Sequence, residues 1–204
     1  MAGLALALVV VWVVVVGAAR GMLHARATGE TGVRFRDRPG SPQRWARVTG
    51  TVGFVLLVLV PVAELAGVPS VPPLDQPAVR AAGLAIAAVG IVGSVFSQAA
   101  MGSSWRADVG PAARTELVTS GPFRWVRNPI FTASAMVALG VALMVPNLLA
   151  LPMLTMIVAT YQIQVRLVEE PYLRHVHGDA YRAYSERVGR FIPFVGREPR
   201  TRRS

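Results

Sequence analysis

The chain has 204 residues, of which 53% are hydrophobic and only 16% charged, and its net charge is +10. Soluble globular proteins usually contain about a quarter charged residues, so this composition argues against that class. The absence of cysteine excludes a disulfide framework, a zinc–thiolate site and a cysteine nucleophile, and the absence of lysine excludes Schiff-base chemistry. The positive charge does not predict nucleic-acid binding, because the arginines lie between hydrophobic stretches, where anionic lipid headgroups are the expected partners.

Three apolar stretches in the first half of the chain predict membrane-spanning helices at about residues 4–19, 48–68 and 78–100. The first stretch is not preceded by a basic residue, which indicates a retained helix rather than a signal peptide. The second and third are separated by a turn with four prolines in nine residues, which cannot continue a helix.

Residues 129–165 are also apolar, and a single helix of that length would be about 55 Å long, too long for one crossing. Pro146 and Asn147 near the middle predict the tip of a helical hairpin with two short arms. The sequence therefore predicts an all-α, integral membrane bundle of about five transmembrane helices.

The arginines indicate how this bundle is oriented. Seven fall in residues 20–47, four in residues 101–128 and nine from Arg166 onward, and only Arg80 lies near the other two connections. Alternation through five helices places the three basic regions on one side, which the positive-inside rule makes cytoplasmic. We expect a bacterial plasma-membrane protein with its N-terminus outside. Its two regions are residues 1–100, with three helices and a basic loop, and residues 101–204, with the hairpin and a cytoplasmic helical tail.

A dense polar and aromatic run precedes the fourth span. Asn128-Pro129 predicts the start of a helix, whose free N–H groups and positive dipole end favour an anion. The alternative is an interfacial belt, with Trp125 at the headgroups and the arginines Arg124 and Arg127 reaching toward them.

A second run follows the fifth span. One helical stripe is expected to carry Arg166, Glu169, Glu170 and Leu173. Its arginine and glutamate could form a weak, exposed ion pair, or its two acids could face a cationic or polar group. Pro171 predicts a kink.

Three further polar residues lie beyond it. His175 and His177 are two positions apart and Asp179 follows Gly178, a predicted helix end, so no metal site is expected.

Together the two runs resemble the isoprenylcysteine carboxyl methyltransferase family and its relatives among phospholipid methyltransferases. The resemblance covers roughly residues 102–193. It is carried by Leu117-Val-Thr-Ser-Gly-Pro-Phe-Arg-Trp-Val-Arg-Asn-Pro-Ile-Phe131, Glu169-Glu170-x-x-Leu173, Gly178-x-x-Tyr181-x-x-Tyr184 and Arg187-Val-x-Arg-Phe-Ile-Pro193.

The resemblance implies that S-adenosylmethionine binds at the cytoplasmic membrane face, in a pocket that the tail completes and that opens sideways to lipid. It implies that Arg166 orients the acceptor. An amine or hydroxyl acceptor would also need a base, for which Glu170 and His175 are the candidates. The residues that it implies for the cofactor are Thr115, Glu116, Leu117, Val118, Phe123, Asn128, Pro129, Ile130, Phe131, Glu169, Tyr181 and Tyr184.

The chain departs from the family pattern in two places. The family often has His and Tyr where this chain has Asn128 and Phe131, and Arg166 is offset by about one position from the acceptor arginine of the animal-type enzymes. The expected function is methyl transfer to a lipophilic acceptor, with the carboxylate of an isoprenoid or prenylcysteine-like compound favoured, because an ionised carboxylate needs a cation to place it and no base.

Two other functions remain open at this stage. One is an NADPH-dependent membrane reductase of the sterol-reductase type, in which Arg124, Arg127 and the tail arginines would hold a 2′-phosphate. The other is a non-catalytic membrane protein. The oligomeric state is also open, because the spacing Gly83-x6-Gly90-x2-Gly93 permits close helix contacts within one chain or between chains.

Overall fold

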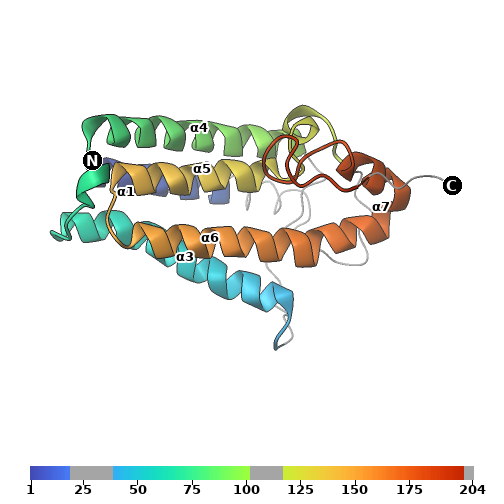
Figure 1. The fold of residues 1–204 in the computed structure, drawn as a ribbon, viewed down its shortest axis with the longest axis horizontal. Helices are drawn as coiled ribbons and strands as arrows, with labels where there is room; N and C mark the ends of the chain where they lie inside the picture. The colour runs from blue at the N-terminus through green and yellow to red at the C-terminus, as the bar shows by residue number, and fades with distance from the viewer. Residues whose placement is uncertain (19–38, 102–116, 200–204) are drawn as a thin grey trace.

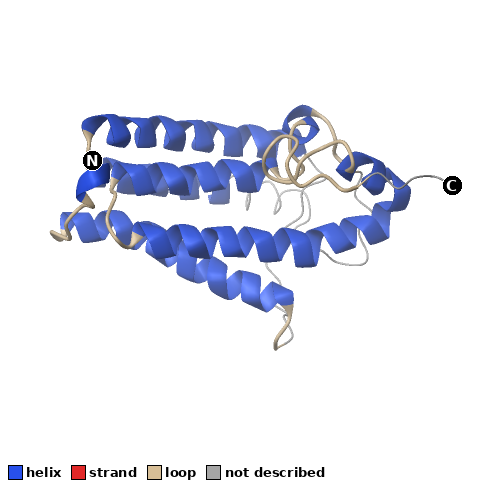
Figure 2. Cartoon of the chain, in the orientation of Figure 1, coloured by secondary structure: helices blue, strands red, loops and turns tan. Residues whose placement is uncertain are grey.

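The computed structural model describes residues 1–18, 39–101 and 117–199, and the regular structure within these ranges is helical (Figure 2). Two isolated bridges, Ser70 with Asn147 and Val126 with Gly189, are the only strand-like pairings found there. The elements are α1 (Ala2–Trp12) with the π-helix η1 (Val13–Ala18), α3 (Pro42–Leu65), η2 (Pro72–Leu74), α4 (Pro77–Met101), η4 (Gly121–Arg124), α5 (Pro129–Met144), α6 (Ala150–Ile163) with the π-helix η5 (Gln164–Glu169), and α7 (Glu170–Ser185).

Five helices run along the long axis of the molecule, as the sequence predicts (Figure 1). Three helical runs are long and apolar enough to cross a membrane, namely Pro42–Leu65, Pro77–Met101 and Ala150–Ser185. The apolar helices Ala2–Val16 and Pro129–Met144 are shorter. The prediction of an all-α membrane bundle is therefore confirmed.

The two arginine-poor turns adjoin at one end of the bundle, which we call the turn end. The amide of Val71 donates to the Pro146 carbonyl at 2.7 Å. At the hairpin tip, the Asn147 side chain donates to the Val60 carbonyl at 2.8 Å and accepts from the Leu149 amide at 3.1 Å. The N-terminus lies at this same end (Figure 1).

Arg80, the one arginine outside the three basic regions, is neutralised at the turn end. Its guanidinium donates to the carboxylates of Glu64 and Asp75, each at 2.8 Å. It also donates to the Met144 carbonyl and the Ser70 hydroxyl, each at 2.9 Å. A paired arginine at this position adds little net charge to that side of the bundle.

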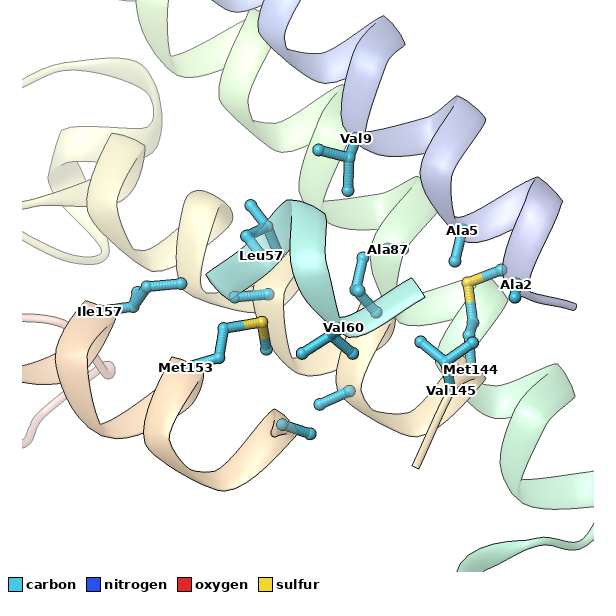
Figure 3. Close-up of a cluster of buried hydrophobic side chains, with 14 residues drawn as sticks. Ala2, Ala5, Val9, Leu57, Val60, Ala87, Met144, Val145, Met153 and Ile157 are labelled. Carbon is cyan, nitrogen blue, oxygen red and sulfur yellow. The ribbon is translucent and has the colours of Figure 1, made fainter. Parts of the chain in front are cut away.

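The main hydrophobic core draws side chains from all five helices (Figure 3). Ala5 and Val9 of α1, Val60 of α3, Val141 of α5 and Met153 of α6 are all fully buried there. The core extends toward the turn end, so the bundle is held together away from the segments that carry the sequence motifs.

Helices α4 and α5 are in backbone contact through glycine. A Cβ atom at Gly83 would lie 2.7 Å from the Gly140 carbonyl oxygen, and one at Gly90 would lie 2.7 Å from the Ala133 carbonyl oxygen. Small residues of this kind allow helices to pack closely where apolar burial alone provides no driving force. The glycines predicted for close packing at positions 83 and 90 therefore act within the chain, between α4 and α5.

The last helical run extends beyond the bundle and the chain then returns (Figure 1). Ala150–Ser185 has 36 residues, or about 54 Å, which is longer than the roughly 30 Å of a bilayer core. This run therefore has length for one crossing and for a further segment at its C-terminal end. The expected kink at Pro171 is replaced by the wider turns of η5 just before it, because proline lacks an N–H and its ring excludes the carbonyl four residues earlier. The run bends at Gly178, whose φ of 51° suits glycine.

Candidate active site

The tail that follows α7 is fastened to the start of α5, at the end of the bundle opposite the turn end, which we call the tail end. The amides of Arg127 and Asn128 donate to the carbonyls of Gly189 and Arg190, at 2.8 and 3.1 Å. The Thr132 hydroxyl donates to the Phe191 carbonyl at 2.8 Å. The expectation that the N–H groups before α5 are free for an anion is therefore wrong for these two amides, which the tail carbonyls already occupy.

A tight turn holds the tail in this position. The Arg190 amide donates to the Val195 carbonyl at 2.8 Å, which folds residues 190–195 back on themselves. A Cβ atom at Gly189 would clash with the Ile192 carbonyl oxygen and lie only 2.8 Å from the Phe194 amide nitrogen. Only glycine leaves room for this turn.

A buried carboxylate joins the tail, α7 and α5. Glu170 accepts from Arg127 at 2.7 Å, and from two nitrogens of Arg190 at 2.8 and 2.9 Å. Arg174 lies 3.4 Å from its second oxygen and also pairs with Glu198. Burial of Glu170 raises the pKa of its carboxyl, but the hydrogen bonds from Arg190 and Arg127 outweigh burial and hold this pKa below its ordinary value. Glu170 is therefore an ionised structural anchor, a geometry that does not favour a general base.

Arg127 is buried rather than exposed at the lipid headgroups. Its guanidinium donates to the Ser185 and Val188 carbonyls at 2.9 and 2.7 Å, besides its bond to Glu170. The interpretation of Arg127 as an interfacial residue is wrong, because its guanidinium is buried and forms an ion pair with Glu170 inside the protein. By contrast Arg124 is exposed, with its guanidinium 4.8 Å from the centre of the Trp125 ring.

Two tyrosines expected at the cofactor lie in a small hydrophobic cluster. Tyr181 and Tyr184 are buried with Val188, and Leu117 and Leu173 pack against them. The Tyr184 hydroxyl donates to the carbonyl of Phe123, which is itself buried, at 2.6 Å. Among the residues predicted for the cofactor, the structure thus joins Leu117, Phe123, Tyr181 and Tyr184 as a support between η4 and α7.

Two other predicted residues have an aromatic or polar partner near the C-terminal end of α6. The ring of Phe131 lies 4.8 Å from that of Tyr161, centre to centre. The Gln164 side chain donates to the Glu169 carboxylate at 3.1 Å. The Gln162 side-chain oxygen is buried and has no hydrogen-bond partner among the described residues. Gln162 and Tyr161 are therefore new candidates for contacts with a cofactor, besides Phe131 and Glu169.

The remaining predicted residues are placed as follows. Arg166, on η5, is exposed, while Glu170 one turn later is buried beneath the tail, so the two do not share one environment. Pro129 is buried, and Val118, Asn128 and Ile130 are half-buried. Thr115 and Glu116 lie outside the described residues. Among the described residues no group of three or more His, Asp or Glu side chains could hold a metal ion.

Two comparisons with known proteins bear on the family and on the fold of the chain. The family model for phospholipid methyltransferase matches residues 78–180, just over half of the chain. The chain belongs to the phospholipid methyltransferase family. It is an integral membrane protein, and methyltransferases of this family use S-adenosylmethionine.

One solved structure is also similar. It is that of the eukaryotic intramembrane Ras methyltransferase, an isoprenylcysteine carboxyl methyltransferase, with a TM-score of 0.58 and 19% sequence identity. The match covers 89% of this chain and 63% of the other one. This chain therefore spans less than two thirds of the length of the methyltransferase that it matches. At this identity the likeness shows a shared fold. Among curated proteins, none matches the chain significantly.

The residues at the tail end of this phospholipid methyltransferase-family chain fit the cofactor. S-adenosylmethionine carries a sulfonium, an ammonium and ribose hydroxyls, which need acceptors and negative charge close by. The Glu169 carboxylate and the unpartnered buried oxygen of Gln162 supply such acceptors. The Phe131–Tyr161 ring pair supplies an aromatic surface for a planar base or a cation.

Four contributors escaped the sequence prediction, namely Arg190, Gln162, Tyr161 and, in its buried role, Arg127. Arg190 and the buried role of Arg127 were missed, although an acid as close to the bilayer as Glu170 must be paired, and this requirement was the available signal. Tyr161 carries no comparable signal, because an aromatic residue in an apolar helix is indistinguishable from ordinary core.

Proposed function

We propose that this protein transfers a methyl group from S-adenosylmethionine to the carboxylate of a lipophilic acceptor, an isoprenoid or prenylcysteine-like compound. Family membership supports the methyl transfer. The acceptor class is inferred from the contacts of Glu170, the first residue of α7.

The observation that carries the acceptor class is the group of three arginines that lie against the Glu170 carboxylate. An amine or hydroxyl acceptor must lose a proton, and a base for that proton needs a pKa near neutrality. Three arginines lie against the Glu170 carboxylate, and the pKa of this group is lowered. A carboxylate acceptor is already ionised at neutral pH and needs no base, so it suits a site in which this acid is unavailable.

Arg166 is the residue proposed to place that carboxylate. It is exposed on η5, directly after the spanning helix α6, and Leu167 beside it is exposed as well. A guanidinium can bind a carboxylate with two hydrogen bonds, while the apolar body of the acceptor stays in lipid. S-adenosylmethionine, when bound, would supply the methyl group from its sulfonium, and the products would be the methyl ester of the acceptor and S-adenosylhomocysteine.

The remaining proposed roles follow from position. Glu169, held by Gln164, would accept from the polar groups of the cofactor. The tail, fixed by Glu170, would exclude water from the reacting atoms, because a dry and ordered site favours in-line transfer. We place this end of the bundle in the cytoplasm, since the arginine-rich segments belong to it.

The test is a transfer assay with radiolabelled S-adenosylmethionine, using the purified chain in vesicles that contain a lipid extract. The lipid product is treated with mild alkali, which hydrolyses a methyl ester to volatile methanol but leaves an N-methyl group attached. We expect the label to become volatile, and we expect Arg166→Ala to abolish this product while Arg166→Lys retains part of it.

The other results have distinct meanings. Label of the lipid product that stays non-volatile after the alkali treatment would retain the methyltransferase but overturn the carboxylate, and would point to a lipid amine. No lipid-bound label, together with a response to NADPH, would overturn the proposed function itself.

A further inference from the structure

An apolar turn at the tip of the tail is exposed in the structure. Ile192, Phe194 and Val195 are 60%, 69% and 59% exposed, and Pro193 completes the turn. Contiguous exposed apolar residues of this kind mark a surface that another phase or molecule covers. Phe194 also has a φ of 69°, in the left-handed region. This conformation is rare for a bulky residue.

The attachment of the tail gives the depth of this turn. The Phe191 carbonyl accepts from the hydroxyl of Thr132, which lies in the first turn of α5. Helix α5 has 16 residues, or about 24 Å, which is shorter than a hydrocarbon core of about 30 Å. Both ends of α5 must then lie at or inside the membrane interface. The turn that follows Phe191 starts at that same level.

Charged and aromatic neighbours fit the same boundary. The guanidinium of Arg197 lies 4.6 Å from the centre of the Phe194 ring. The segment that pairs with the tail through Val126 and Gly189 carries exposed Trp125, beside Arg124. Tryptophan and arginine at the edge of an apolar surface are typical of residues that sit at lipid headgroups.

We propose that the turn Ile192–Val195 is inserted into the lipid bilayer, with Arg197 and Arg124 at the headgroup level. The tail is then held from two sides. Inside the protein, Glu170 binds Arg190, two residues before the turn. Outside, lipid covers the apolar tip. The proposal rests on burial and position alone, so it is independent of the acceptor and of the reaction.

Spin labelling tests this insertion directly, and the chain suits it because it has no native cysteine. A nitroxide is attached to Phe194→Cys, or in a second variant to Ile192→Cys, in vesicles of phosphatidylcholine and phosphatidylglycerol. Its collision rates are measured with oxygen, which concentrates in hydrocarbon, and with a water-soluble nickel chelate. Val92→Cys serves as the lipid-facing control within α4, and Asp179→Cys serves as the water-exposed control on α7.

We expect high oxygen and low nickel accessibility at positions 192 and 194, close to the values at position 92. Nickel accessibility like that of position 179 would overturn the proposal and place the turn in water. Low accessibility to both reagents would also overturn it, because a second protein chain would then cover the turn. The two labelled positions are exposed, so loss of folding in both variants is not expected.

Discussion

Replacing Glu170 by glutamine should loosen the tail without unfolding the bundle. The substitution removes the negative charge against which Arg127 and Arg190 are packed, at 2.7 and 2.8 Å. Arg127 then remains as a buried cation with no counter-charge. The core shared by the five helices (Figure 3) includes none of these residues.

The size of the effect follows from the geometry of the three arginines. Removing one member of a buried ion pair typically costs about 3–5 kcal/mol. Arg127 keeps its bonds to the carbonyls of Ser185 and Val188, and Arg174 is half exposed, so its pair contributes little. We therefore expect the substitution to destabilise the docked tail by about 3 kcal/mol. The undocked state would then be populated about 100-fold more often than in the unsubstituted chain.

Hydrogen exchange measures this change at defined amides. The amides of Arg127 and Asn128 donate to tail carbonyls, and the Arg190 amide donates within the turn. We expect all three to exchange about 100-fold faster in Glu170→Gln, while amides of α4 are unchanged. Asp179→Asn is the matched control, because its carboxylate is fully solvated on the same helix and pairs only with exposed Arg182. Equal exchange in Glu170→Gln and Asp179→Asn would refute the structural role of the cluster.

Three further predictions follow. Glu169→Gln should weaken binding of S-adenosylhomocysteine, whereas Arg166→Ala should abolish turnover with binding retained. Calorimetry measures the binding and the transfer assay measures the turnover. Normal binding and turnover in both variants would contradict these assignments. Gly140→Ala should destabilise the bundle by about 1–3 kcal/mol, because its Cβ would lie 2.6 Å from the Gly83 carbonyl oxygen, while Gly3→Ala, with open space around it, should leave the thermal midpoint unchanged. Because the pKa of Glu170 is lowered in the folded chain, its stabilisation is complete above its ordinary value of about 4.3 and is lost as the pH falls below that. Tail-amide exchange, corrected for its intrinsic pH dependence, should therefore show constant protection between pH 5 and 8; loss of protection within that range would contradict the assignment.

The bundle was predictable because its signals are local. Long apolar runs, the prolines near residues 69–77 and Pro146-Asn147 each specify a helix or a turn within a few residues. The arginine-poor turns do adjoin, as the contact from Val71 to Pro146 shows. The glycines at positions 83 and 90 indicated close packing, but the choice of α5 as their partner depends on the three-dimensional arrangement.

The site was less predictable because its contacts join segments far apart in the sequence. The stripe of Arg166, Glu169 and Glu170 was read as one surface, yet the returning tail covers only part of it. The partners of Glu170 at positions 127 and 190 come from different elements. The two tyrosines that follow Gly178 also pack α7 against η4, a contact that their spacing in the sequence does not indicate.

The central claim is a cofactor site at the tail end, between the start of α5, the end of α6 and the docked tail. Calorimetric titration of the detergent-purified chain with S-adenosylhomocysteine, with NADPH titrated in parallel, tests it most directly. We predict saturable binding of S-adenosylhomocysteine, none of NADPH, and weaker binding in both Glu169→Gln and Glu170→Gln. Binding of NADPH alone, or equal affinity for S-adenosylhomocysteine in all three proteins, would contradict the account.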